Sequence, residues 1–192
     1  MNNAGAALLG AVADLDDEAA RTQFETMVLG PVRLARAAIG TGECRRVVQV
    51  GTIVAGGAIP FTGWYAAAKA ALDALIQVWR VELVPRGVEL VTVECGAVAT
   101  DVWDQAGEQV AEGEDPTTAS ARRRWAELAE VLEPRFADPD RIGVAIAQAA
   151  LEDRPDARVH VGFGSTIGRL VRFVPRPVRE RVTAAVLGLR PS

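Results

Sequence analysis

The sequence predicts an α/β fold in which a parallel sheet is covered by helices on both faces. Short apolar runs rich in β-branched residues alternate with longer segments of helical periodicity, the order expected of a parallel sheet. The chain shows no internal repeat and no interdomain linker, and its 192 residues suffice for one domain with a sizeable core. We therefore take 1–192 as a single domain.

The first predicted helix covers 16–39. Acidic residues from Asp16 to Glu18 favour a helix N-terminus, and Gly40 and Gly42 end the segment. One apolar face is formed by Val28, Val32, Ala35 and Ile39. The apolar run 46–51 follows and is predicted to be a buried strand.

The clearest helix covers 65–84. Its apolar face consists of Leu72, Ile76, Trp79 and Leu83. Alanines at 66–68, 70 and 71 allow another element to approach closely, and we expect the chain to form a homo-oligomer through this helix. The triplet 85–87, Pro-Arg-Gly, ends the helix, and the next strand is predicted at 88–94.

The last part of the chain combines a polar segment with a further helix and strand. Residues 101–137 are charge-rich and form the predicted substrate loop or lid, with one helix at 119–132. Another helix is predicted at 138–151, opened by an acidic cap and a proline, and the last strand at 157–162. The tail 163–192 is predicted to be helical and is rich in arginine.

We expect this tail to pack on the domain or on a partner subunit, and contact with an anionic membrane surface is the less favoured alternative.

Composition narrows the functional classes. Charged residues make up 24% of the chain and the net charge is −4, which argues against a nucleic-acid partner. The two cysteines, Cys44 and Cys95, have neither the spacing of a metal site nor that of a disulfide framework. No signal peptide and no apolar stretch of about 20 residues is present. The sequence therefore predicts a cytoplasmic protein without a metal.

Tyr65 and Lys69 lie four residues apart on the predicted helix 65–84, so their side chains emerge on one face, one turn apart. A lysine ammonium within about 4–6 Å of a phenol favours the tyrosinate and typically lowers its pKa by about 1–3. The pair could therefore exchange a proton with a substrate near neutral pH. On its own such a pattern is weak, and the alternative is an accidental pair on a helix surface.

The neighbouring segments resemble the short-chain dehydrogenase/reductase family in order and in spacing. Residues 2–5, Asn-Asn-Ala-Gly, resemble the turn after that family's fourth strand, and 28–34 resembles its fourth helix. Thr52 stands thirteen residues before Tyr65, the family's distance between its active-site hydroxyl and its tyrosine. Residues 65–69 match the tyrosine–lysine helix, and 95–101 resemble the segment that contacts the nicotinamide.

This resemblance implies a Rossmann-like fold and hydride transfer between NAD or NADP and an alcohol/carbonyl pair of a small-molecule substrate. By the same resemblance, Tyr65 is the acid/base, Lys69 lowers its pKa and binds the nicotinamide ribose, and Thr52 holds the substrate oxygen. The family pattern further implies that Val98 and Thr100 position the carboxamide. It also implies that Asn2 and Asn3 fix the turn beside the cofactor.

The sequence departs from the family at three places. The Gly-rich phosphate loop and the first strands are expected upstream of Asn2, so the sequence predicts a fold truncated at its N-terminus. Met27 stands where the family has an asparagine that serves the proton relay, and we interpret this methionine as a core residue. Threonine at Thr52 is a conservative change from serine, and Cys95 replaces a proline.

Two functions follow from these observations. The first is an oxidoreductase of the short-chain dehydrogenase type, seen as a fragment. The alternative is a catalytically silent, truncated homologue that acts as a structural or interaction module.

Overall fold

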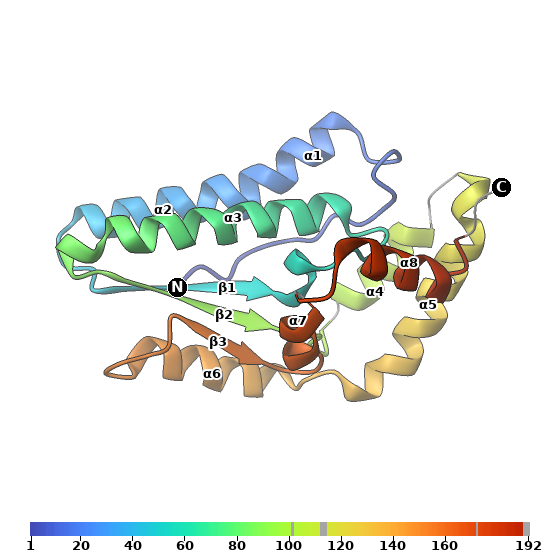
Figure 1. Cartoon of the computed structure of the whole chain (residues 1–192). Helices are drawn as coiled ribbons and strands as arrows, with labels where there is room; N and C mark the ends of the chain where they lie inside the picture. Colours follow the sequence, from blue (N-terminus) through green and yellow to red (C-terminus); the bar gives the residue numbers. More distant parts are fainter. Residues whose placement is uncertain (101, 112–114, 172, 190–192) are drawn as a thin grey trace.

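The structure is a computed structural model that describes residues 1–100, 102–111, 115–171 and 173–189 (Figure 1). Its strands are β1 (Arg46–Thr52), β2 (Glu89–Cys95) and β3 (Arg158–Val161). Its helices are α1 (Asp17–Phe24), η1 (Glu25–Leu29), α2 (Gly30–Gly40), η2 (Ile53–Gly56), α3 (Gly63–Glu82), η3 (Val84–Arg86), α4 (Val102–Ala111), η4 (Pro116–Thr118), α5 (Ala119–Leu132), η5 (Glu133–Arg135), α6 (Pro139–Leu151), α7 (Ser165–Val171) and α8 (Arg176–Val186).

The three strands form one parallel sheet in the order β1-β2-β3. Each strand lies within one or two residues of its predicted range, because apolar β-branched runs bounded by turn residues are strong local signals. The predicted α/β fold with a parallel sheet covered by helices is confirmed.

Successive strand residues point to opposite faces of the sheet, and each face carries its own core. Val47 and Leu90 pack with α2 and α3, whereas Val48 and Val91 pack with α6. Figure 1 shows α1, α2 and α3 on one side of the sheet and α6 on the other. The strand ends point toward α4, α5, α7 and α8, so these four helices gather where the strands end.

The predicted helix 16–39 is interrupted, and this corrects the expectation of one continuous helix. Between α1 and α2 lies the π-helical turn η1, in which the amide of Gly30 donates to the carbonyl of Glu25. Pro31 follows directly. Because proline lacks an N–H and its ring clashes with the carbonyl four residues earlier, a regular α-helical turn is disfavoured before it. We attribute the wider turn to this proline.

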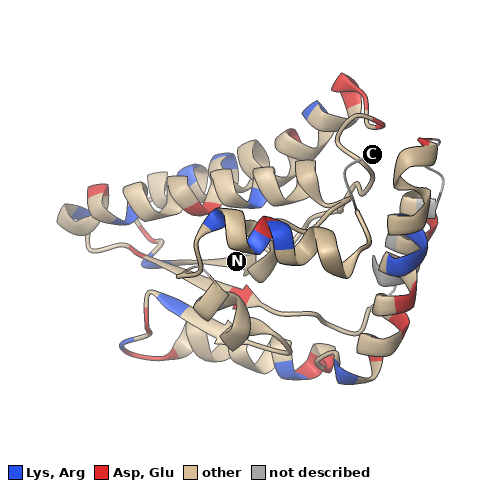
Figure 2. Cartoon of the chain, turned by 45° about the vertical axis from the view of Figure 1, so that its right-hand side comes forward, with Lys and Arg blue, Asp and Glu red and all other residues tan. Residues whose placement is uncertain are grey.

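The start of α6 confirms the expected acidic cap and proline. Asp138 accepts a hydrogen bond from the amide of Asp140, at 2.8 Å, and Pro139 is the first helical residue. Along α5 the basic residues precede the acidic ones, whereas α8 carries one acidic residue among its arginines (Figure 2). Within the described ranges, no helix is both long enough and apolar enough to cross a membrane.

Candidate active site

Thr52 and Tyr65 meet at the end of β1. Thr52 is the last residue of that strand, Tyr65 lies in the first turn of α3, and the threonine hydroxyl is near enough to the phenol to lower its pKa. The Oγ1 atom of Thr52 also accepts from the amide of Val54, at 3.3 Å, and so caps η2. The chain from 53 to 62 therefore leaves the strand and returns to set the phenol beside the threonine.

Phe61 fixes the entry into α3. Its φ of 67° lies in the left-handed region, a conformation that costs a residue other than glycine roughly 1–3 kcal/mol. Its side chain is buried, and its carbonyl accepts from the amide of Gly10, at 2.8 Å. Packing and hydrogen bonding thus hold a strained turn four residues before Tyr65.

Lys69 lies one helical turn after Tyr65, and its Nζ donates to the carbonyl oxygen of Val50, at 3.1 Å. Burial raises the pKa of Tyr65, and the hydrogen bond from Thr52 partly opposes this. Burial lowers the pKa of Lys69. In this structure the pKa of Tyr65 therefore moves upward, opposite to the expected direction, because the loss of water around the phenol is the largest effect.

Cys95, at the end of β2, is buried and also influences this pair. Burial raises the pKa of its thiol to about 11, with Lys69 acting in the opposite direction. A thiol with such a pKa is protonated and unreactive at neutral pH. This supports the interpretation of Cys95 as a small buried hydrophobe.

Asn2 joins the strand edge to helix α2, whereas Asn3 is exposed. The amide of Asn2 donates to the carbonyl of Val48, at 2.8 Å, and its carbonyl accepts from the amide of Val50, at 3.0 Å. Its Nδ2 donates to the carbonyl of Pro31, at 3.0 Å. Asn2 is thus placed beside the strand that ends at Thr52.

Val98 and Thr100 lie after the end of β2. Val98 forms a parallel bridge with Ala137, and Thr100 is exposed. Before them, Gly96 passes so close to the chain that a Cβ atom would lie 1.9 Å from the carbonyl oxygen of Phe163. Glycine is therefore required at the point where the chain leaves the sheet toward Val98.

Met27 is a core residue, as interpreted from the sequence. It is 3% exposed, and its Cε would lie 2.8 Å from a Cβ at Gly5. It belongs to the core cluster against which Tyr65 packs. An apolar thioether here packs the Asn-Asn-Ala-Gly turn against η1.

An apolar wall surrounds the other side of Tyr65. It brings together side chains from the N-terminal segment, α4, α5 and the chain after α8, and its buried members are Leu9, Phe61, Val110, Ala121, Trp125 and Leu187. Side chains of α4, α5 and the chain after α8 therefore meet over the candidate site. Residues 101 and 112–114 of the predicted lid, and 172 and 190–192 of the predicted tail, lie outside the described residues.

An ionic cluster beside the site was missed from the sequence. Arg158 of β3 pairs with Glu94 of β2 and with Asp73 of α3. Glu94 is 1% exposed, and Nδ1 of His160 lies 3.7 Å from its Oε1. The only signal was a glutamate inside the apolar run 88–94, which by itself names no partner.

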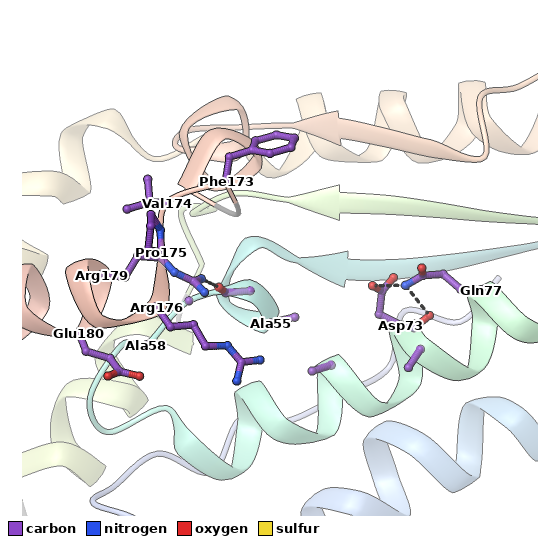
Figure 3. A pocket seen from close by; sticks show the side chains of 14 residues that line it. Ala55, Ala58, Asp73, Gln77, Phe173, Val174, Pro175, Arg176, Arg179 and Glu180 are labelled. Atoms are coloured by element: carbon purple, nitrogen blue, oxygen red, sulfur yellow. Dashed lines mark hydrogen bonds between the residues drawn. The ribbon is translucent and has the colours of Figure 1, made fainter.

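A separate cavity of about 740 Å³ lies on the flank of α3, between Ala55, Gln77 and the segment 173–180 (Figure 3). Neither Thr52, Tyr65 nor Lys69 lines it. Arg179 donates to the carbonyl of Gly56 and so ties the tail to the loop after Thr52. In the part of the chain that the structure describes, no group of His, Cys, Asp and Glu side chains is placed to hold a metal ion.

Comparisons with known proteins agree with this geometry. A family model described as short chain dehydrogenase matches residues 1–111. Human 17-beta-hydroxysteroid dehydrogenase type 1 is 28% identical over 163 residues, which are 81% of this chain and 50% of that protein. Retinol dehydrogenase 8 of Bos taurus is 31% identical over 121 residues, which are 62% of this chain and 39% of that protein. The chain thus spans half the length, or less, of these curated relatives.

Solved structures show the same fold. A short-chain dehydrogenase from Streptomyces avermitilis has a TM-score of 0.71 at 26% identity, over 95% of this chain and 65% of that one. A short chain dehydrogenase from Burkholderia cenocepacia, solved in complex with NADP, shares the fold with a TM-score of 0.66 at 23% identity, over 99% of this chain and 68% of that one. Since the family model covers more than half of the 192 residues, this chain belongs to the short-chain dehydrogenase family.

Proposed function

We propose that the protein is an NAD(P)-dependent oxidoreductase that interconverts an alcohol and a carbonyl group of a small-molecule substrate. The observation that carries this is that Thr52 at the end of β1 and Tyr65 in the first turn of α3 lie together, with Lys69 one turn away and bonded to the carbonyl of Val50. Tyr65 gives a proton to the carbonyl oxygen during reduction and takes it back during oxidation. Thr52 holds that oxygen, and the ammonium of Lys69 stabilises the tyrosinate.

The residues present fit the nicotinamide end of the cofactor. Lys69 and Tyr65 lie beside the last residues of β1, Thr100 is exposed after β2, and Asn2 bridges to β1 and is followed by the exposed Asn3. In this proposal Lys69 binds the ribose, Val98 and Thr100 position the carboxamide, and both NAD and NADP remain candidates. When bound, the nicotinamide supplies or accepts the hydride.

We further propose a cytoplasmic protein in which 101–137 acts as a lid and 163–192 as a packed tail. The relatives named for hydroxysteroid and retinol dehydrogenation support a substrate with an apolar body, and so does the apolar wall around Tyr65. Exposed apolar side chains on α3, at Leu75, Val78 and Val81, support a homo-oligomer through this helix.

The test is consumption of NADH or NADPH, followed at 340 nm with a panel of apolar ketones and aldehydes. Any turnover that is observed should be abolished by Tyr65→Phe, because the ring packing survives and the proton is lost. A general acid–base step is typically worth about 10²–10⁴-fold. No turnover with either cofactor would favour the second function, a silent homologue, for which the core position of Met27 is the supporting observation.

A further inference from the structure

Beyond Val47 and Leu90, toward the carboxyl ends of the strands, the face of the sheet below α3 becomes polar, unlike the other face, whose core stays apolar. Two rows of residues cross the three strands on this face. One row is Gln49, Thr92 and Arg158, and the other is Gly51, Glu94 and His160. Glu94 and Thr92 are both buried, so charged and polar groups lie between the catalytic helix and the strands.

Helix α3 is tied to this face by polar contacts that follow one another along its length. Tyr65 lies beside Thr52, and Lys69 donates to the carbonyl of Val50. Asp73, one turn further, pairs with Arg158, which also pairs with Glu94. Figure 3 shows Asp73 held in addition by Gln77, whose Nε2 donates to Oδ2 at 2.9 Å.

A second arginine ties down the C-terminal half of the helix. Nε of Arg80 donates to the carbonyl of Leu90, at 2.8 Å, and its Nη2 to the carbonyl of Ala157, at 3.0 Å. Arg80 and Arg158 therefore both bridge α3 to the sheet. The Arg158 pairs are the ones next to Lys69.

Apolar packing alone would leave the axial position of α3 poorly defined. Ala68, Leu72 and Ile76 bury one stripe of the helix, but burial of apolar area is non-directional. A slip of one residue moves a helix by about 1.5 Å and rotates its side chains by about 100°. Such a slip would separate Tyr65 from Thr52, whereas the planar fork of a guanidinium fixes two carboxylates in direction as well as distance.

We propose that Arg158, through Asp73 and Glu94, is a positioning residue that sets the register of α3 and thereby the Tyr65–Thr52 geometry. Buried ion pairs often add little stability compared with apolar replacements, and fixing register is their best-attested use. Arg158 lies beyond the residues 1–111 that the family model matches, on the last strand. The inference rests on the proposed role of Tyr65 and Thr52.

The test uses the fact that Tyr65 is the only tyrosine in the chain. Its ionisation is followed by ultraviolet absorbance near 295 nm, which requires neither cofactor nor substrate. Thr52→Val removes the hydroxyl that lowers the pKa of Tyr65, so in the wild-type background it raises that pKa. We measure this shift again after replacing the cluster with apolar residues, Asp73→Leu, Glu94→Leu and Arg158→Met, which leaves no buried charge without its partner.

In the apolar background we expect Thr52→Val to lose most of its effect, because the hydroxyl no longer meets the phenol. The matched control is the exposed pair Arg33–Glu25, replaced as Arg33→Met and Glu25→Gln, where the full shift should persist. If Thr52→Val still raises the pKa of Tyr65 by the full wild-type amount in an apolar variant that unfolds cooperatively, the proposal is wrong.

If the apolar variant does not fold, the test uses Arg158→Lys instead. Lysine keeps the positive charge but cannot bind two carboxylates with a planar guanidinium. A reduced effect of Thr52→Val in this background supports the proposal, and an undiminished effect overturns it. An inactive chain would still show the coupling, so failure of the proposed oxidoreductase activity is distinguished from failure of this inference.

Discussion

Tyr65 is subject to two opposing influences on its pKa. Burial disfavours the charged tyrosinate and raises the pKa, while the hydrogen bond from Thr52 favours the tyrosinate and lowers it. The first is the larger. A phenol in this state is a proton donor at neutral pH, which suits reduction of a carbonyl, and the tyrosinate form becomes accessible only when further positive charge approaches.

Removal of the Thr52 hydroxyl gives the first prediction. In Thr52→Val burial acts unopposed, so the pKa of Tyr65 rises further above its ordinary value. Absorbance titration near 295 nm measures it directly in the 192-residue chain. The control is Thr166→Val on the exposed side of α7, which should leave the titration unchanged. An unchanged or lower midpoint in Thr52→Val would mean that the hydroxyl does not meet the phenol in solution.

The glycine after β2 gives a second prediction. In Gly96→Ala the new methyl would lie 1.9 Å from the carbonyl oxygen of Phe163, a backbone atom that cannot move aside without shifting β3. We expect a loss of several kcal/mol in the free energy of unfolding, above the roughly 1–3 kcal/mol of ordinary overpacking. Urea denaturation followed by tryptophan fluorescence measures it.

The matched control for that glycine is Gly143 in α6. A Cβ there meets nothing within 4 Å, so Gly143→Ala should stabilise the protein by about 0.5–1 kcal/mol through helix propensity. Equal effects of the two substitutions would contradict the close approach of Gly96 to β3.

Most of the secondary structure could be predicted from local sequence patterns, but one helix could not. The strands at 46–52 and 89–95 and the helix at 63–82 follow from local apolar patterns and turn residues, and their predicted bounds shift by two residues or fewer. The helix at 16–39 was predicted without its π-helical turn, because the helical pattern does not show how the chain accommodates Pro31. The Tyr65–Lys69 pair was also predictable, since both residues lie on one helix.

Arg158 was not predictable as a neighbour of that pair. It lies 64 positions from Glu94 and 85 from Asp73, so no local pattern joins the three residues. The direction of the Tyr65 pKa shift was likewise missed, because burial depends on α4, α5 and the tail folding over the phenol. Contacts between elements that are far apart in the chain could therefore not be predicted from the sequence.

The packing of α4, α5 and the chain after α8 against Tyr65 leads to a further prediction. Trp125 of α5 is 8% exposed and fills the apolar wall, so Trp125→Ala should cost about 3–5 kcal/mol of unfolding free energy. Because the cavity admits water toward the phenol, the pKa of Tyr65 should also fall toward its ordinary value.

The control on the same helix is Val131, which is 63% exposed. Val131→Ala should change stability by no more than about 0.5 kcal/mol and should leave the Tyr65 titration as it is. A stable Trp125→Ala variant with an unshifted tyrosine would mean that α5 does not cover Tyr65 in solution.

The order of the strands has a consequence for how the protein folds. The connections β1-α3-β2 and β2-α6-β3 run the same way across the sheet but over opposite faces, so one of them has the rare left-handed sense. Arg158 reaches Asp73 and Glu94 only when β3 docks, because these residues are 85 and 64 positions away along the chain. Closing such long loops costs conformational entropy before the contacts can stabilise the structure. We therefore expect β3 to join late, after β1, α3 and β2 have assembled. A nascent chain would then hold Tyr65 and Lys69 for some time without the arginine proposed to fix their helix, and Tyr65 would reach its final place beside Thr52 only at the end of folding.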